Sequence, residues 1–279
     1  MHMFENGERR INWWSASSTT STTTTPVVFL HAFPLASSMW KPQVDLQECG
    51  IDVFACDLYG FGGSDASDDP ADYSIDALAG DLHRFLAEVV KRPAVICGLS
   101  LGGYIALRAA IVDSSLMSGL ILADVGAGSD EPEAFHKEVE AWAAAYEASD
   151  VDAFLERLLQ DPLFGDSRTL GADVFDAIVD TIRTNPKSGV IQTARHVIAG
   201  RTPVYSLEVA MQGLDIPTLV MVGGSDDKCL RPAAFLARTI PGARLETFQD
   251  CGHFINVERS ARFNALLDEF VRSLKTDDR

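Results

Sequence analysis

Residues 95–104 read Val-Ile-Cys-Gly-Leu-Ser-Leu-Gly-Gly-Tyr, an apolar run that breaks into the pattern G-x-S-x-G before an alanine-rich segment. The pattern predicts a strand, a sharp turn and a helix, with Ser100 at the tip of the turn. A serine hydroxyl is a weak nucleophile unless a base takes its proton and hydrogen-bond donors receive the oxyanion. If Ser100 is a nucleophile, the chain must therefore also supply a base, an acid that orients the base, and two donors.

Six histidines are candidates for the base, and His253 has the most suitable position. It lies in the stretch Cys-Gly-His-Phe at 251–254, directly after the last predicted strand, where sites form in α/β proteins. Three other histidines fall within predicted helices and one lies at the N-terminus. His31 follows an early strand, and we expect it to hold its loop in place rather than act as a base.

The orienting acid should leave the sheet at the same edge and precede the histidine in the chain. Residues 221–227 read MVGGSDD and supply it directly after a predicted strand. Counting from the strand end favours Asp226, whereas counting back from Pro232 favours Asp227. We take Asp226 as the acid, with Asp124, at the end of an earlier strand, as a weaker third candidate.

The oxyanion needs two backbone N–H donors, one of which belongs to the residue after the nucleophile. Here that residue is Leu101. The second donor should come from the loop after the strand at 27–30, which reads His-Ala-Phe-Pro. Proline has no N–H, so Phe33 is the predicted contributor.

Short β-rich runs alternate with amphipathic segments over most of the chain, which predicts βαβ units and a mostly parallel sheet. An N-terminal hairpin is expected around Asn6-Gly7, and the Ser/Thr-rich tract 15–25 is expected to be a solvated loop. The predicted strands after the hairpin are 27–30, 51–55, 94–97, 119–123, 218–222 and 243–248. Amphipathic helices are predicted near 75–89, after a possible N-cap at Ser74, and near 263–274.

The alternation fails between Ala127 and Leu214, where four helical stripes follow one another and no strand is expected. This segment is interpreted as a helical insertion into one sheet, because a strand pattern resumes at Thr218. A second core domain is the alternative. The stripes carry more apolar surface than short helices need to pair with each other, so some of their side chains are expected to line an acyl or aromatic pocket. The large residues concerned are Phe135, Trp142, Tyr146, Phe154, Leu158, Phe164 and Phe175.

The composition limits which kinds of molecule the protein is expected to bind and where it is expected to act. The chain of 279 residues carries a net charge of −17, which repels nucleic acids and anionic membrane surfaces. No apolar run is long enough to span a bilayer, and the start has no secretion signal, so a soluble cytoplasmic protein is expected. The five cysteines are odd in number and lack metal-site spacing, which predicts reduced thiols and no metal.

Taken in order, these motifs resemble those of the α/β-hydrolase superfamily over nearly the whole chain. HAFP at 31–34 is similar to the family's oxyanion loop, and DLYGFGGS at 57–64 looks like its D-x-x-G-x-G-x-S loop. Two departures are Ala32, where glycine is usual, and one extra residue between the acid and the following proline. The resemblance implies an eight-stranded, mostly parallel sheet flanked by helices, with a core of 1–126 and 215–279 and a helical cap at 127–214.

We expect a serine hydrolase that cleaves carboxylic esters of small to medium uncharged acyl groups through an acyl-enzyme. Its catalytic residues would be Ser100, Asp226 and His253, with Phe33 and Leu101 donating to the oxyanion. No cofactor is expected, and the only expected partner is the small ester substrate. Alternatives are a lactonase or a C–C bond hydrolase with the same residues, or a non-catalytic receptor for a small ligand on the same fold. The sequence does not indicate an oligomeric state.

Overall fold

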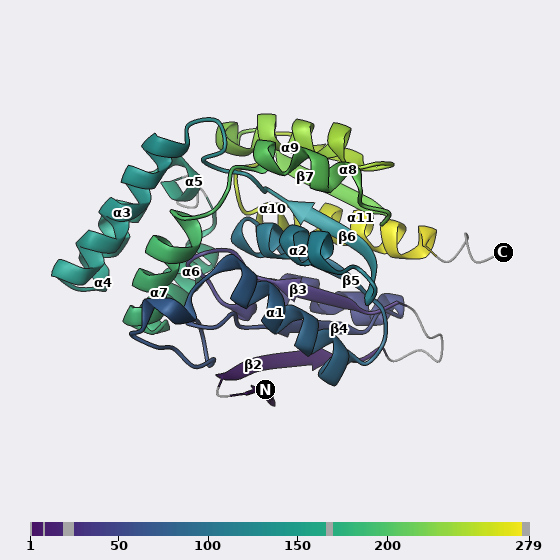
Figure 1. Ribbon diagram of the computed structural model, residues 1–279, viewed down its shortest axis with the longest axis horizontal. Helices are drawn as coiled ribbons and strands as arrows, with labels where there is room; N and C mark the ends of the chain where they lie inside the picture. The colour runs from purple at the N-terminus through teal and green to yellow at the C-terminus, as the bar shows by residue number, and fades with distance from the viewer. Residues whose placement is uncertain (1, 8, 19–24, 166–169, 275–279) are drawn as a thin grey trace.

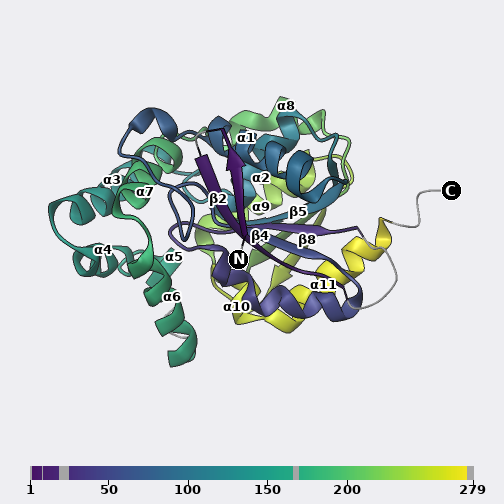
Figure 2. The ribbon, with the colours of Figure 1, turned by 90° about the horizontal axis from the view of Figure 1, so that it is seen from below.

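The computed structural model describes residues 2–7, 9–18, 25–165 and 170–274. They form one eight-stranded sheet in the order β1-β2-β4-β3-β5-β6-β7-β8 (Figure 1). The pairs β1-β2 and β2-β4 are antiparallel, and every other neighbouring pair is parallel. Helices α1, α2, α8 and α9 lie on one face of the sheet, with α10 and α11 on the other (Figure 2). The prediction of a mostly parallel eight-stranded sheet flanked by helices is confirmed.

The six predicted strands after the hairpin all form, with ends that differ from the prediction by at most two residues. Strand β5 is buried along its whole length, which explains why it reads as one apolar run rather than as an alternation. The bounds are β1 His2–Asn6, β2 Arg9–Ala16, β3 Val27–Leu30, β4 Val53–Cys56, β5 Ala94–Leu99, β6 Met117–Ala123, β7 Thr218–Gly223 and β8 Arg244–Phe248.

The N-terminal hairpin also forms as predicted, with Asn6 opposite Arg9 and Gly7 at φ 65°. The Ser/Thr-rich tract differs in part from the expected loop. Ser15 and Ala16 belong to β2, where they pair with Phe54 and Val53, because the second hairpin strand continues along β4. Residues 19–24 of the tract lie outside the described residues.

The helices of the α/β layer include both amphipathic segments predicted from the sequence. Ser74 caps the first of them, since its Oγ accepts a hydrogen bond from Ala77 N at 3.1 Å. The 3₁₀ segment at 37–49 has no counterpart in the prediction. The bounds are η1 Ser37–Cys49, η2 Pro70–Asp72, α1 Ile75–Phe85, η3 Leu86–Val90, α2 Leu101–Val112, α9 Asp227–Thr239, α10 Ile255–Glu258 and α11 Ser260–Ser273.

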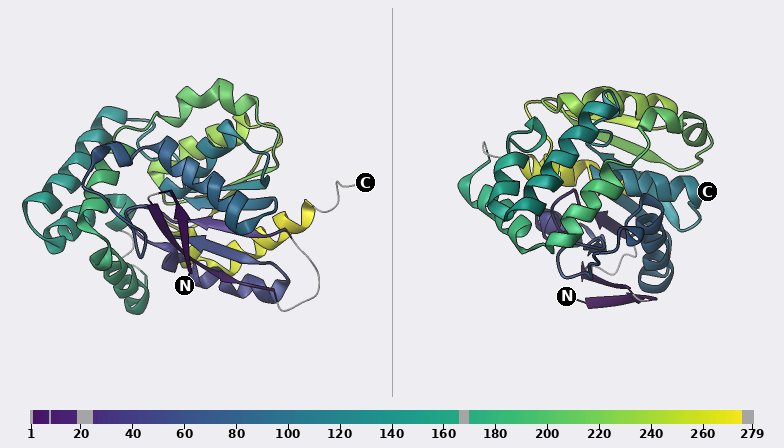
Figure 3. Two further views of the ribbon diagram at one scale, coloured as in Figure 1. Left: turned by 60° about the horizontal axis from the view of Figure 1, so that its bottom comes forward. Right: turned by 60° about the vertical axis from the view of Figure 1, so that its left-hand side comes forward.

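The described part of the segment 127–214 is helical and contains no strand. Helices α3 to α7 gather at one end of the sheet (Figure 3), whereas α8 packs beside α9. The division into core and cap stays a prediction. None of the described helices is both long and apolar enough to cross a membrane. The bounds are α3 Pro132–Ala148, α4 Val151–Leu158, α5 Pro162–Gly165, α6 Ala172–Thr184, α7 Lys187–Gln192, η5 Thr193–Ile198, η6 Val204–Leu207 and α8 Glu208–Gln212.

Helix α2 approaches the sheet so closely that one methyl group added at Gly102 would collide with the backbone of β3. A Cβ at Gly102 would stand 2.2 Å from the carbonyl oxygen of Leu30, which is backbone and cannot move aside. We expect G102A to lower the free energy of unfolding by about 1–3 kcal/mol, measured by urea denaturation. G80A is the control, because a Cβ at Gly80 in α1 meets nothing within 4 Å and should be neutral or stabilising by about 0.5–1 kcal/mol. Equal stability of the two variants would contradict the close approach.

Candidate active site

Ser100 occupies the turn between β5 and α2 in a conformation that few non-glycine residues adopt. Its φ is 54° and its ψ is −113°, and its N–H donates to the carbonyl oxygen of Ala123 at 2.8 Å. Such backbone strain costs on the order of 1–3 kcal/mol and clusters at functional sites. The turn leaves Ser100 partly exposed between two buried neighbours, Leu99 and Leu101.

The strand register brings the segments that follow five strands to the same edge of the sheet. Leu30 and Leu122 both pair with Gly98, Ala123 pairs with Met221, and Gly223 pairs with Phe248. The residues that follow these positions therefore emerge side by side. They include all five predicted site residues: Phe33, Ser100, Leu101, Asp226 and His253.

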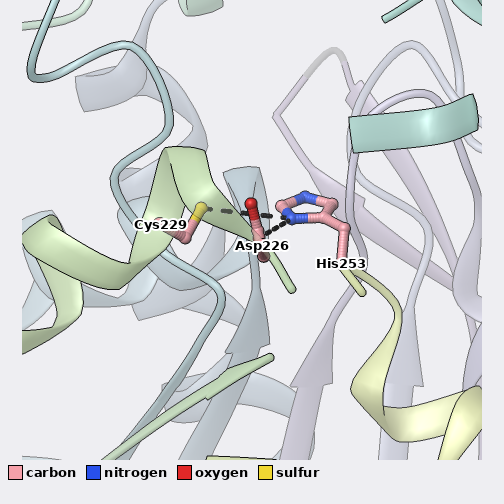
Figure 4. Close-up of side chains that lie close together, drawn as sticks. All are labelled: Asp226, Cys229 and His253. Atoms are coloured by element: carbon pink, nitrogen blue, oxygen red, sulfur yellow. Dashed lines mark hydrogen bonds and ion pairs between the residues drawn. The ribbon is translucent and has the colours of Figure 1, made fainter. Parts of the chain in front are cut away.

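Asp226 and His253 form a buried hydrogen bond at this edge (Figure 4). The Nδ1–H of His253 donates to Asp226 Oδ2 at 2.6 Å, and each side chain is only 2% exposed. Burial by itself would raise the pKa of Asp226, but the charge interaction and hydrogen bond with His253 outweigh it and hold that pKa below its ordinary value. The geometry thus fixes an ionised carboxylate on one nitrogen of the imidazole and leaves Nε2 for other chemistry.

The structure brings Asp226, and not Asp227, to the histidine. Asp226 precedes α9, and its N–H donates to the carbonyl oxygen of Gly223 at 3.1 Å, which turns its side chain toward the sheet edge. Asp227 is the first residue of α9 and is exposed. The count back from Pro232, which favoured Asp227, therefore selects the residue that the structure leaves on the surface.

Glu258 holds the loop that carries His253, and the sequence reasoning did not find it. Its two carboxylate oxygens accept hydrogen bonds from Gly252 N at 2.8 Å and Phe254 N at 3.1 Å. The two amides flank His253 on both sides. A glutamate five residues downstream has no strand or helix pattern that would mark it, so only the folded loop reveals its role.

Cys229, from the first turn of α9, completes a cluster of three groups of metal-ligating type. Ligand atoms of Asp226, Cys229 and His253 all lie within 4.8 Å of one another. The Sγ of Cys229 lies 4.0 Å from His253 Nδ1 and donates to the carbonyl oxygen of Asp124 at 3.2 Å. Burial raises the pKa of this thiol well above its usual range, which keeps it protonated. The cluster is therefore organised by hydrogen bonds among its own members, and all five cysteines of the chain are free.

Ser100 and His253 are not joined by a hydrogen bond, since the Ser100 hydroxyl has no hydrogen-bond partner within the described ranges. Hydrogen bonds of this kind are often loose without substrate and tighten only in the complex. The structure thus assembles the Asp226 to His253 half of the predicted arrangement and places Ser100 on the turn after β5, at the same edge of the sheet.

The backbone N–H groups of Phe33 and Leu101 donate to no other group in the described part of the chain. Both residues are buried. Their segments touch, because Gly102 packs directly against the carbonyl oxygens of Leu30 and His31. The structure therefore leaves both predicted donors without a hydrogen-bond partner among the described residues, on segments that adjoin each other.

His31 serves the loop and not the chemistry, in agreement with the role expected for it. Its Nδ1–H donates to the carbonyl oxygen of Ala32 at 2.9 Å, and its Nε2 accepts from Leu58 N at 2.9 Å. Burial lowers the pKa of His31, which keeps the ring neutral. Asn185, after α6, also holds this loop: it donates to Pro34 O at 2.7 Å and accepts from Gly62 N at 2.8 Å.

Aromatic rings from the segment 127–214 lie against Phe33 and His253 at this edge of the sheet. The ring of Trp142 stacks on Phe33 with centroids 6.4 Å apart, and the ring of Phe164 lies edge-on to His253 at 6.4 Å. Trp142 and Phe164 also touch each other at 5.6 Å. Phe154 also contacts Phe33, edge-on at 6.4 Å, so three of the aromatics predicted to line a pocket lie against predicted site residues.

Two cavities adjoin this region. The smaller, of about 180 Å³, is lined by Asp226 and His253 together with Leu163 and Lys228. The larger, of about 730 Å³, lies between α3, α4 and the start of α9 and shares Pro162, Asp227 and Lys228 with the smaller. Neither of these two cavities is lined by Ser100. Cavity volume alone therefore does not locate the predicted catalytic residues.

Sequence comparison decides the family. A family model described as "Alpha/beta hydrolase family" matches residues 27–266, most of the chain. The chain belongs to the alpha/beta hydrolase family.

Relatives of this alpha/beta hydrolase carry several activities in their names. It is 24% identical over 252 residues to a putative 2-succinyl-6-hydroxy-2,4-cyclohexadiene-1-carboxylate synthase of Bacillus subtilis, covering 89% of this chain and 90% of the relative. It is 23% identical over 250 residues to 3-oxoadipate enol-lactonase 1 of Acinetobacter baylyi, covering 89% of each.

Solved structures agree on the fold. A thermophilic esterase from Thermogutta terrifontis superposes with a TM-score of 0.81 at 27% identity, over 95% of this chain and 94% of the esterase. MenH from S. aureus superposes with a TM-score of 0.84 at 22% identity, over 94% of this chain and 98% of MenH. Relatives of the alpha/beta hydrolase thus include esterases and lactonases, and the chain shares their fold.

The choice between the two neighbouring aspartates can be tested directly in this alpha/beta hydrolase. We expect D226N to lower kcat by about four orders of magnitude, because the amide removes the charge that orients the imidazole. D227N should stay within about twofold of wild type, since Asp227 is exposed. The measurement is hydrolysis of p-nitrophenyl acetate, with circular dichroism to verify folding. A larger loss in D227N than in D226N would overturn the assignment.

Proposed function

We propose that the protein is a serine hydrolase that cleaves carboxylic esters through an acyl-enzyme intermediate. The observation that carries the proposal is the 2.6 Å hydrogen bond between buried Asp226 and His253, set at the same sheet edge as the strained turn of Ser100. In this mechanism His253 Nε2 takes the proton of the Ser100 hydroxyl as its Oγ bonds to the ester carbonyl carbon. Asp226 fixes the ring tautomer and stabilises the imidazolium that forms.

The tetrahedral oxyanion then accepts hydrogen bonds from the amides of Phe33 and Leu101. Both amides lack another partner among the described residues, so they bind the oxyanion without breaking a bond in the resting protein. Donors that need no rearrangement are worth several kcal/mol in such a step. The imidazolium returns its proton to the leaving alcohol, the C–O bond breaks, and the acyl group stays on Ser100.

Deacylation repeats the sequence with water. His253 removes a proton from a water molecule, whose oxygen bonds to the acyl carbon, and then returns the proton to Ser100 Oγ as the acid leaves. Asp226 remains ionised throughout. The described residues supply every proton transfer that this route requires.

The charge distribution supports uncharged acyl groups as substrates. Lys228, the cation that lines the cavity of Asp226 and His253, is paired with Asp161 at 2.6 Å. The two further cations of the larger cavity also form ion pairs: Arg157 with Glu138 at 2.8 Å and Arg231 with Asp130 at 3.7 Å. Trp142 and Phe164 present apolar rings beside Phe33 and His253. We therefore propose small to medium uncharged acyl groups. Five free thiols fit a reducing compartment, and we propose the cytoplasm.

Lactone hydrolysis is the second candidate, because the same residues open a cyclic ester and one relative is named an enol-lactonase. The ring-opened product would stay on Ser100 as a hydroxyacyl group until water releases it. C–C bond hydrolysis and a receptor without catalysis are the further alternatives on this fold.

The test is turnover by wild type and S100A on a panel of p-nitrophenyl acetate, butyrate and hemisuccinate with two simple lactones. We expect hydrolysis of the neutral esters, weaker activity on the anionic hemisuccinate, and a loss of about four orders of magnitude in kcat for S100A. S115A is the matched control, since Ser115 is exposed and lies in the turn after α2, at the end of the helix far from Ser100. S100A with near-wild-type turnover would disprove the nucleophile, and a preference for the hemisuccinate would disprove the substrate class.

A further inference from the structure

A second aspartate lies beside the Asp226 and His253 side chains, and the proposed mechanism does not use it. Asp124 directly follows β6 and is fully buried, with an exposed fraction of 0%. Its backbone is left-handed, at φ 48°, and its N–H donates to Met221 O at 2.9 Å. The strained backbone turns this residue from β6 toward the end of β7.

Among the described residues, only one of the two oxygens of the Asp124 carboxyl group accepts a hydrogen bond. Its Oδ1 accepts from Gly223 N at 2.8 Å. Its Oδ2 is buried, and no donor from the described residues reaches it. Cys229 places Asp124 beside Asp226, because its Sγ donates to the carbonyl oxygen of Asp124 at 3.2 Å and lies within 4.8 Å of the Asp226 carboxyl group. After burial, interaction with Asp226 is the main cause that raises the pKa of Asp124. Two carboxyl groups can share a hydrogen bond only if one of them carries a proton.

We propose that Asp124 is held as a neutral carboxylic acid that donates a hydrogen bond to the Asp226 carboxylate, and is thereby a positioning residue for the Asp226 and His253 side chains. The proton satisfies the orphaned oxygen of Asp124 and gives Asp226 a second donor beside His253. This inference rests on the proposed function for its catalytic consequence, although the protonation state itself does not depend on it.

The surroundings of the two acids decide which one carries the proton. Asp226 faces His253 and accepts its hydrogen bond, so the negative charge resides on Asp226. Among the described residues, the titratable groups that interact with Asp124 are Asp226 and Cys229 from the start of α9, Cys251 from the loop before His253, and Glu258 from α10. The cation Arg201 acts on Cys229 and is not among the groups that shift the pKa of Asp124. Burial and the charge of Asp226 both raise the pKa of Asp124 well above its ordinary value, against the hydrogen bond from Gly223 N.

A neutral donor at this place has a mechanistic effect that a second carboxylate would not have. It fixes the rotamer of Asp226 and draws off part of its negative charge. A second carboxylate would repel Asp226 and overstabilise the imidazolium, which slows return of the proton to the leaving group.

The protonation state can be tested without any activity measurement. The folded wild type keeps the Asp124 proton, whereas the unfolded chain releases it above about pH 4, so wild type loses stability with rising pH relative to D124N. We expect the ratio of unfolding constants, wild type over D124N, to rise about tenfold per pH unit from pH 5 until Asp124 ionises in the fold. Asparagine suits the site because it tolerates a positive φ and offers both a donor and an acceptor.

The matched control is D113N, the same substitution at an exposed aspartate whose pKa is lowered by hydrogen bonds from Ser115. Its ratio to wild type should stay constant from pH 5 to pH 8, because Asp113 is ionised in both states. A ratio for D124N that is equally flat would show that Asp124 is ionised in the fold and would overturn the proposal.

The positioning role is tested by the pH profile of kcat/KM on p-nitrophenyl acetate. D124N should keep the acid limb of wild type and an activity within about threefold, because the amide replaces the donor. D124A removes the donor, so its acid limb should move to higher pH by up to about one unit, a tenfold change in the protonation equilibrium, and its kcat should fall about tenfold.

Three results would contradict this role: a D124N acid limb at lower pH, a D124A profile equal to wild type, or loss of D124N activity with the fold intact. The last would assign the charged partner of His253 to Asp124. If wild type itself fails to hydrolyse esters, the proposed function fails, whereas the pH dependence of stability still decides the state of Asp124.

Discussion

The contact between the start of α2 and its neighbouring strands is tight enough that backbone occupies the space a side chain would need. A Cβ at Gly98 would stand 2.3 Å from the carbonyl carbon of Gly102, and a Cβ at Gly102 would stand 2.2 Å from Leu30 O. This contact forces the chain to reverse within one residue, which places Ser100 at a positive φ. It also presses the loop that carries Phe33 against the first turn of the helix. The strained serine and the two unsatisfied amides are therefore consequences of one packing constraint.

The part of the site formed by Asp226 and His253 depends on the parallel register of β6, β7 and β8. Because β6, β7 and β8 end together, Asp124, Asp226 and His253 meet in a region from which water is excluded. In such surroundings an unpaired charge is costly. One ionised carboxylate facing one imidazole, with a neutral acid and a neutral thiol beside them, keeps the number of buried charges low. The same arrangement prepares the imidazole to accept a proton at Nε2.

Much of this architecture follows from local patterns. Apolar runs and turn residues predicted the strands to within two residues, and the family motifs pointed to Ser100, His253 and the choice between two aspartates. Asp226 could not be separated from Asp227 before the first turn of α9 was known. Glu258 and Asn185 stayed hidden because their partners are loop amides, which leave no periodic signal. The packing of Trp142 and Phe164 on the site likewise arises from contacts between distant segments. The 3₁₀ segment at 37–49 has a weak apolar pattern and a proline within it, which masked it.

The central claim is that Ser100 is activated in the folded protein. The most direct measurement is labelling with a fluorophosphonate, which reacts with activated serines, followed by intact mass and peptide mass spectrometry. The account predicts one phosphonyl group per chain, located on Ser100 in the peptide that contains residues 98–102, with labelling lost in H253A. A folded protein that takes up no label, or that carries the label on another residue, would contradict the account.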